Sequence, residues 1–274
     1  MLSFPNCKIN LGLHVIEKRS DGFHNIETVM VPCEWQDMLE IIPDEKTNDE
    51  IDFKCTGIRL YGTKGKNLCI KAIDLLSKNY TIPKVKMHLH KLIPVGAGLG
   101  GGSSDAAATI SILNKIFKLN ISENDQESFA NQLGSDCAFF VRNKPVFATG
   151  KGEIMEPLKL KLKNVFCVII KPRIHISTSE AYSWIKPVKR NSSLKELIQL
   201  PMNDWKNLIE NDFEKVIFEK YPAIKNIKSR LYKLGATYAS MSGSGSAVYG
   251  LFSEEKHLDT YFRSSTVWSG FIRY

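Results

Sequence analysis

Residues 94–104 read PVGAGLGGGSS, and five of the seven positions from 96 to 102 are glycine. So many glycines would destabilise a helix or a strand, so the segment must be a loop that needs positive φ angles or a close approach to another group. Before it, Val85, Met87 and Leu89 alternate with polar residues, which predicts a half-buried strand. After it, residues 105–117 are rich in alanine and aliphatic residues at helical spacing. The stretch therefore predicts a strand, a glycine loop and a helix, in that order.

This order is typical of a phosphate-binding loop, because bare backbone N–H groups and the positive end of the next helix attract an anion. A dinucleotide fingerprint fits less well, since it needs an acidic residue about 20 positions later at a second buried strand. Residues 116–122 instead resemble a helix end. A Walker loop would require Gly-Lys-Ser/Thr, whereas two serines follow Gly102. A flexible linker is disfavoured by the strand before the loop and the helix after it.

The rest of the chain indicates an α+β protein. We expect strands at 7–15, 26–31, 146–148 and 165–170, and helices at 67–76, 123–133, 193–199, 204–219 and 222–234. A loop at 177–179 leads into a further helix, and a glycine-serine turn at 242–246 joins two strands. A shift toward Lys and Leu at 157–163 indicates a boundary, which predicts domains at 1–156 and 157–274.

Composition narrows the class of protein. The chain has 274 residues, of which 43% are hydrophobic, enough for a globular core. No apolar run approaches the roughly 20 residues of a membrane-spanning helix, and residues 1–10 do not resemble a cleavable leader. We therefore expect a cytoplasmic protein without a membrane partner. The six cysteines form no Cys-x-x-Cys pair and have no histidine at metal spacing, so no zinc site is indicated.

The formal charge of +8 is compatible with nucleic acid or with small anionic ligands. The lysines are scattered along the chain, and the densest run, Lys159, Lys161 and Lys163, alternates with leucines. That alternation is typical of the solvated face of a strand. We therefore expect small anionic ligands rather than nucleic acid.

Several polar residues are candidates for chemistry, each with a structural alternative. Asp136 precedes an apolar run and could be a catalytic carboxylate or a helix N-cap. Lys8 and Asn10 share one face of the strand at 7–15, where Lys8 could also reach solvent. Phe23 and His24 follow a turn, and a single aromatic is more often a core residue. The turn at 242–246 alone could be a tight hairpin.

The segment PVGAGLGGGSSDAA at 94–107 closely resembles the phosphate loop of the GHMP kinase superfamily. Four further motifs occur in the order of that family: PNCKINL at 5–11, RSDGFH at 19–24, GSD at 134–136 and MSGSGS at 241–246. The resemblance spans almost the whole chain. The tripled glycine resembles the branch that phosphorylates the 2-hydroxyl of 4-diphosphocytidyl-2-C-methyl-D-erythritol, in the non-mevalonate route to isoprenoid precursors.

The resemblance implies a two-lobed fold with an N-terminal ribosomal protein S5 domain 2-like lobe and a C-terminal ferredoxin-like α/β lobe, with the active site in the cleft between them. It implies ATP as co-substrate, Mg²⁺ with the ATP, and a cytidine-diphosphate-linked sugar alcohol as acceptor. For the assembly we expect a monomer or a weak homodimer.

The same resemblance assigns roles to matching residues. Asp136 matches the proposed general base, and Lys8 matches its electrostatic partner. The residues that match the ATP site are Pro94, Gly96, Ala97, Gly98, Leu99, Gly100, Gly101, Gly102, Ser103, Ser104 and, beside the adenine pocket, Asn67. Those that match the substrate site are Asn10, Phe23, His24, Thr178, Tyr182, Gly243 and Ser244, with Phe23 and Tyr182 enclosing the cytosine ring and His24 bonding its edge.

Two positions depart from the pattern of the family. Phe23 replaces the more usual tyrosine, which keeps stacking but loses a hydroxyl, and Ala138 stands where proline is common. The nearest rival function is another kinase of the superfamily, acting on mevalonate or homoserine, which would have no use for a cytosine sandwich. A rival of another class is a non-catalytic nucleotide or nucleic-acid binder, which would need neither Lys8 nor Asp136 and would bind random oligonucleotides in a salt-sensitive way.

Overall fold

The computed structural model describes residues 1–46, 49–60, 65 and 67–274. These residues form two compact units. Unit 1 comprises Met1–Cys7, Trp35–Val95 and Gly100–Asn143, and unit 2 comprises Lys8–Glu34, Gly96–Leu99 and Lys144–Tyr274. Both units combine sheet and helix, so the predicted α+β class is confirmed. The sequence boundary between 156 and 157 is a different kind of division and stays a prediction.

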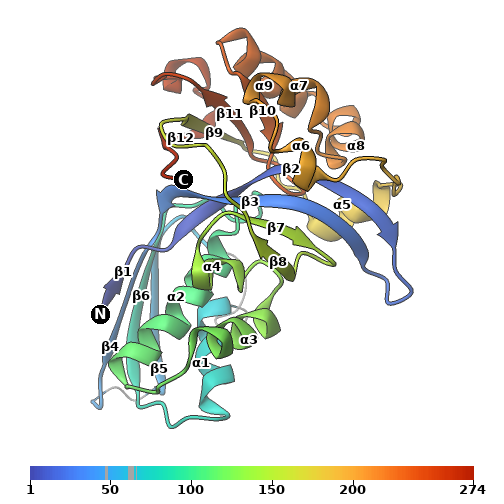
Figure 1. Cartoon of the computed structure of the whole chain (residues 1–274). Coiled ribbons are helices and arrows are strands. Elements are labelled where there is room, and N and C mark those ends of the chain that lie inside the picture. Colours follow the sequence, from blue (N-terminus) through green and yellow to red (C-terminus); the bar gives the residue numbers. More distant parts are fainter. Residues whose placement is uncertain (47–48, 61–64, 66) are drawn as a thin grey trace. The chain divides into compact units, whose positions relative to one another are not determined.

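Unit 1 is built on one sheet whose strand order is β1-β4-β6-β5. Its strands are β1 (Leu2–Ser3), β4 (Met38–Pro43), β5 (Ile51–Gly57) and β6 (Val85–Lys91). Strand β6 pairs antiparallel with β4 and parallel with β5. The helices are α1 (Leu68–Ser77), α2 (Gly101–Ile116), α3 (Glu123–Leu133) and α4 (Phe139–Arg142). Figure 1 shows α1, α2 and α3 gathered beside this sheet.

Helix α2 begins four residues earlier than the alanine-rich pattern predicts, because Gly101 and Gly102 form its first turn. Gly100 precedes the helix with a φ of 70°, a left-handed conformation that suits glycine. Gly101 has no room for a side chain, since a Cβ there would lie 2.8 Å from Cγ2 of Ile93. Glycine at 101 is therefore required by packing, and the true loop is shorter than its glycine content indicates.

Unit 2 contains two sheets. The first has the order β2-β3-β7-β8, from β2 (Asn6–Lys18), β3 (His24–Gln36), β7 (Val146–Thr149) and β8 (Ile154–Pro157). The second has the order β10-β11-β9-β12, from β9 (Phe166–Pro172), β10 (Tyr238–Met241), β11 (Val248–Phe252) and β12 (Ser265–Phe271). The helices are α5 (Thr178–Trp184), α6 (Leu194–Leu197), α7 (Met202–Leu208), α8 (Phe213–Lys220) and α9 (Pro222–Lys233). The first residues of β2 and the last of β3 belong to unit 1.

The core of unit 2 lies where β9 meets the helices that cover its sheet. Phe166, Val168 and Ile170 of β9 pack in one buried cluster with Phe213 of α8 and Leu231 of α9. Cys167 and Ile169, which point to the opposite face of the sheet, are also fully buried, so the continuous apolar run of β9 is explained by burial on both faces.

The prediction of one helix at 204–219 was wrong, because the chain leaves the helical path between α7 and α8. The side-chain amide of Asn211 donates to the carbonyl oxygens of Met241 at 2.7 Å and Gly243 at 2.8 Å. The N–H of Asp212 donates to the carbonyl of Leu13. These distant partners stabilise a buried turn instead of a continuous helix.

The strand expected around Lys159, Lys161 and Lys163 was also wrong. The three lysines are exposed, but they lie in the connection between β8 and β9. Across the described residues, no helix is both long enough and apolar enough to cross a membrane.

Candidate active site

The glycine loop is held in a conformation that only glycine adopts easily. Gly96, Gly98 and Gly100 have φ angles of 61°, 77° and 70°. A Cβ on Gly98 would lie 2.0 Å from the carbonyl oxygen of Ser242, and one on Gly96 would lie 2.7 Å from Cε1 of His175. The prediction that this segment needs positive φ angles and close approach is therefore confirmed. Gly96–Leu99 belong to unit 2 and Gly100 onward to unit 1, so the loop takes part in both units.

Lys8 is bound to the first part of this loop. It is only 3% exposed on β2, and its Nζ donates to Oδ1 of Asn10 at 2.6 Å and to the carbonyl of Gly98 at 3.2 Å. Its backbone N–H donates to the carbonyl of Leu99 at 2.9 Å. The alternative of a solvent-reaching strand lysine is therefore wrong. A buried ammonium is retained only where hydrogen bonds replace water, as these oxygen partners do.

Asn10 fixes the position of Lys8. Its Nδ2 donates to the hydroxyl of Thr28 at 2.9 Å, and that hydroxyl donates to the carbonyl of Gly12 at 2.7 Å. This chain of hydrogen bonds turns Oδ1 of Asn10 toward Lys8, because the amide nitrogen is engaged on the other side. The residues involved are buried, so the arrangement is rigid.

The turn at 242–246 joins the same network. The hydroxyl of Ser242 donates to the carbonyl of Gly98 at 2.8 Å and accepts the N–H of Asn10 at 3.2 Å. A Cβ on Gly243 would lie 3.2 Å from Oδ1 of Asn10. The hydroxyls of Thr178 and Ser244 are 3.1 Å apart. The predicted residues Lys8, Asn10, Gly98 and Gly243 are thus brought together, with Thr178 beside Ser244.

The predicted cytidine residues lie at the other end of β2 and β3. The rings of His24 and Tyr182 stack with centroids 4.9 Å apart, and Tyr182 meets Phe213 edge-on at 4.9 Å. Phe23 is 57% exposed, and Nζ of Lys151 lies 4.7 Å from its ring centroid. Burial, with a contribution from Lys18, lowers the pKa of His24 below its ordinary value. The imidazole is therefore neutral at neutral pH and can donate one hydrogen bond and accept another.

The predicted base lies in unit 1, in the turn between α3 and α4. Helix α4 has Ala138 at its N-cap and no side-chain cap, so the alternative of Asp136 as N-cap is wrong. Burial raises the pKa of the thiol of the next residue, Cys137, to about 11, and the nearby side chain of Ser103 in the first turn of α2 lowers it by less. The turn that carries Asp136 therefore lies close to the turn that carries the predicted phosphate contacts.

Asn67, the residue predicted beside adenine, caps α1. Its Oδ1 accepts the N–H of Cys69 at 2.8 Å. Pro94 ends the segment that follows β6 and leads into the glycine loop.

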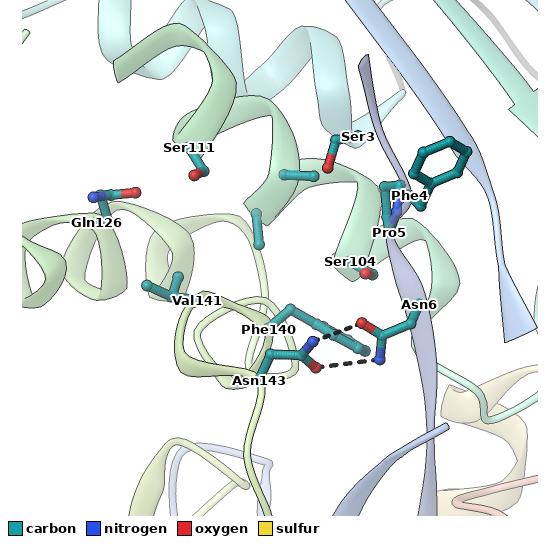
Figure 2. A pocket seen from close by; sticks show the side chains of 12 residues that line it. Ser3, Phe4, Pro5, Asn6, Ser104, Ser111, Gln126, Phe140, Val141 and Asn143 are labelled. Carbon is teal, nitrogen blue, oxygen red and sulfur yellow. Dashed lines mark hydrogen bonds between the residues drawn. The ribbon is translucent and has the colours of Figure 1, made fainter. Parts of the chain in front are cut away.

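A separate small pocket in unit 1 has a volume of about 170 Å³ (Figure 2). Asn6 and Asn143 exchange two side-chain hydrogen bonds, of 2.6 and 3.2 Å, along its wall. Among the predicted site residues, only Ser104 lines this pocket. The pocket and the network around Lys8 are therefore different features.

Sequence reasoning missed several residues that the structure adds to the site. Ser242 and Thr28 fix Asn10, and Lys151 contacts Phe23. Ser242 could have been found from its place in the same glycine-serine turn, whereas Lys151 carries no local signal. In the described part of the chain, no group of three His, Cys, Asp or Glu side chains is placed to hold a metal ion.

Comparison with known proteins identifies the family of the chain. Residues 67–144 match the family model for the GHMP kinases N terminal domain, and residues 189–261 match that for the GHMP kinases C terminal region. A 4-diphosphocytidyl-2-C-methyl-D-erythritol kinase of Parabacteroides distasonis is 47% identical, over 98% of this chain and 99% of the relative. The corresponding kinase of Azobacteroides pseudotrichonymphae is 51% identical, over 92% of this chain and 93% of the relative.

Among solved structures, a 4-(cytidine 5'-diphospho)-2C-methyl-D-erythritol kinase superimposes with a TM-score of 0.83 at 28% identity, covering 98% of each chain. This agreement in sequence and fold confirms the resemblance that the motifs indicate. The chain therefore belongs to the GHMP kinase family and, within it, to the 4-diphosphocytidyl-2-C-methyl-D-erythritol kinases.

Proposed function

We propose that this chain transfers the γ-phosphate of ATP to the 2-hydroxyl of 4-diphosphocytidyl-2-C-methyl-D-erythritol, giving the 2-phosphate and ADP on the non-mevalonate route to isoprenoid precursors. The observation that carries the proposal is the buried ammonium of Lys8, held against the carbonyl of Gly98 in the glycine loop. It occurs in a chain that is 47% identical, nearly from end to end, to a relative that bears the name of this kinase.

In this proposal the glycine loop binds the phosphates of ATP. Successive residues from Gly96 to Ser103 offer backbone N–H groups, and the first turn of α2 adds the positive end of the helix dipole; the N–H of Ser104 already donates to the carbonyl of Gly100. The positive φ angles of Gly96, Gly98 and Gly100 support it, because they let the backbone curve around an anion without side chains in the way. Asn67 borders the adenine in the same proposal.

The chemical step needs a base for the acceptor hydroxyl and positive charge near the γ-phosphate. Asp136 takes the hydroxyl proton as the acceptor oxygen forms its bond to the γ-phosphorus. The bond from that phosphorus to the β–γ bridging oxygen breaks, and its electron pair leaves with ADP. Lys8 neutralises charge on the transferring group. The closeness of the Asp136 turn to Ser103 supports this role, because Ser103 lies in the proposed phosphate turn.

The cytidine is bound by Phe23, His24 and Tyr182. A neutral imidazole suits cytosine, whose edge presents an acceptor nitrogen beside a donor amino group. Because His24 lies on Tyr182 in this structure, the base enters by occupying the face of Tyr182 or by stacking beside the pair. Thr178, Ser244 and Gly243 then border the diphosphate, and Asn10 borders the methylerythritol portion.

Mg²⁺ enters as the MgATP complex, which is the substrate, and we assign no protein ligand to it. The partners are small molecules, with neither nucleic acid nor membrane among them. A cytoplasmic location and a monomer or weak homodimer complete the proposal.

The test is ADP release by the purified protein with MgATP and three acceptors: the cytidylated alcohol, mevalonate and homoserine. We expect turnover with the cytidylated alcohol alone. Turnover with mevalonate and none with the cytidylated alcohol would overturn the assignment. Tight, salt-sensitive binding of random oligonucleotides without ATP turnover would replace it with a binding function.

A further inference from the structure

Three ionisable side chains are buried together in unit 1, and the proposed chemistry uses none of them. Lys91 at the end of β6, Asp37 between β3 and β4, and Asp105 in α2 are each at most 2% exposed. Nζ of Lys91 donates to Oδ2 of Asp105 at 2.8 Å and also to Oδ2 of Asp37. We call these three residues the buried triad. Buried charges are expensive, so a triad of this kind needs an explanation.

The triad contacts the chain on both sides of the glycine loop, just before the loop and at the start of α2. Oδ1 of Asp37 accepts the N–H of Leu92 at 2.6 Å and that of Ile93 at 2.8 Å, just before the loop begins. On the other side, a Cβ on Gly101 would lie 3.0 Å from Nζ of Lys91. The ammonium therefore lies directly against the first residue of α2, in the turn proposed to bind phosphate.

The charges of the triad do not balance when every group is ionised, since one ammonium faces two carboxylates. Burial raises the pKa of Asp105, the ammonium of Lys91 lowers it, and the carboxylate of Asp37 raises it further. Together these effects place the pKa of Asp105 at about 7. Burial lowers the pKa of Lys91, but the two carboxylates raise it by more, so the pKa of Lys91 lies above its ordinary value. Oδ1 of Asp105 is buried and has no hydrogen-bond partner among the described residues, so nothing there replaces the water that would stabilise an ionised carboxylate.

We propose that the buried triad controls the affinity of the first turn of α2 for the phosphates of ATP, and that Asp105 takes up a proton when the nucleotide binds. This inference rests on the proposed function, in which that turn contacts ATP. With Asp105 protonated the triad is neutral, and the positive end of α2 acts on the phosphates unopposed. With Asp105 ionised, the triad places a net negative charge behind the same turn and weakens anion binding. By linkage, a bound anion favours the protonated form.

The other titratable groups around Asp105 do not mimic this effect. From α1 it is faced by Cys69 and from β5 by Cys55, and burial raises the pKa of both thiols above their ordinary value. Both therefore stay neutral between pH 6 and 8.5. His88 and His90 of β6 are out of phase with Lys91, so they lie on the opposite face of the sheet from the triad. There both histidines are hydrogen-bonded to the hydroxyl of Thr56.

The experiment is calorimetric titration of the protein with MgATP at pH 7.5, in two buffers of different ionisation enthalpy, which reports the protons taken up on binding. The wild-type protein is compared with Asp105→Asn, which copies the neutral form, and with Asp74→Asn, an exposed control in α1. Because each protein receives the same nucleotide, the titration of the nucleotide itself cancels in the difference.

We expect the wild-type and Asp74→Asn proteins to take up a few tenths of a proton more than Asp105→Asn. Their dissociation constants for ATP should rise about fivefold between pH 6.5 and 8.5, as for a weak coupling, while that of Asp105→Asn stays at the tight value. Equal proton uptake in all three proteins, or a folded Asp105→Asn that does not bind ATP, overturns the inference. Absence of ATP binding by the wild-type protein would instead overturn the proposed function.

A second measurement covers the case in which Asp105→Asn does not fold. Infrared difference spectra of the wild-type protein at pH 7.5, with and without nucleotide, report the carboxylic-acid C=O band directly. We expect this band to grow on nucleotide binding. No growth at saturating nucleotide contradicts proton uptake by a buried carboxyl group.

Discussion

Replacing Gly98 with alanine perturbs the closest approach in the proposed site. The change adds one methyl group and leaves every hydrogen-bonding atom in place. In the present structure that methyl would lie 2.0 Å from the carbonyl oxygen of Ser242, which is backbone and has no rotamer to escape into. The φ of 77° at this position adds conformational strain for any residue with a Cβ.

The size of the effect follows from two contributions. A positive φ costs an L-residue about 1–2 kcal/mol, and the stiffer unfolded chain offsets about 0.4–1 kcal/mol of this, leaving about 1 kcal/mol. To relieve the clash the loop must move by about 1 Å, which breaks the hydrogen bonds to Gly98 from Nζ of Lys8 and from Ser242. These contribute about 2 kcal/mol for the charged donor and about 1 kcal/mol for the hydroxyl. We therefore expect a loss of about 4 kcal/mol in the free energy of unfolding.

Gly235→Ala is the matched control. Gly235 also lies in unit 2 with a positive φ, 96°, but an added Cβ there meets nothing within 4 Å. It should lose only the strain contribution of about 1 kcal/mol. Urea unfolding followed by tryptophan fluorescence gives both free energies, and steady-state kinetics gives KM for ATP. We expect KM for ATP to rise at least about tenfold in Gly98→Ala alone, since 1.4 kcal/mol of binding energy is tenfold. Equal stability losses in the two variants, with unchanged kinetics, would refute the reasoning.

Four further predictions address catalysis, specificity and acid stability. Asp136→Asn should lower kcat by about 10²–10⁴-fold, measured as ADP release, and should change the dissociation constant of ATP little, measured by calorimetry. Turnover at the wild-type rate would remove Asp136 from the mechanism. Lys8→Met keeps the stem but removes the ammonium that donates to Asn10 and Gly98, so it should lower kcat by about 10²–10³-fold and the free energy of unfolding by about 2 kcal/mol. Normal turnover in the folded variant would exclude Lys8 from charge neutralisation. Phe23→Ala should raise KM for the cytidylated substrate about tenfold, as expected for the loss of one stacking contact with a base, without raising KM for ATP. Phe271→Ala is the control, because Phe271 is also an exposed phenylalanine. Equal effects of the two substitutions would argue against stacking. Burial, with Arg190, lowers the pKa of His14 to about 4, so the unfolded state binds a proton first as the pH falls below 6.5, and stability is lost from there down to pH 4. Between pH 7 and 5, His14→Leu should lose about 2 kcal/mol less stability than the wild-type protein. Urea unfolding curves that shift equally with pH in both proteins would contradict this.

Local sequence determined the elements that depend on short-range rules. The glycines at 96, 98 and 100 permit the positive φ angles that the loop adopts, and the alternation at 85–89 predicts the half-buried strand that is observed. The motifs around Lys8, Phe23 and Asp136 also identified the family before any contact was known. The loop and the strand could be predicted because φ preferences and hydrophobic periodicity act between residues that are near in the sequence.

Tertiary structure decided which polar groups meet, because the partners come from distant segments. Asn211 breaks the predicted helix at 204–219 only because the carbonyls of Met241 and Gly243 are there to accept its amide. Ser242 holds Asn10 across 232 residues of sequence, and Asp37 bonds Lys91 across 54. Lys91 did carry a local signal, since it continues the apolar phase of β6, but nothing local says which carboxylates neutralise it. A buried charge can be read from a sequence; its partners are set only when the chain has folded around it.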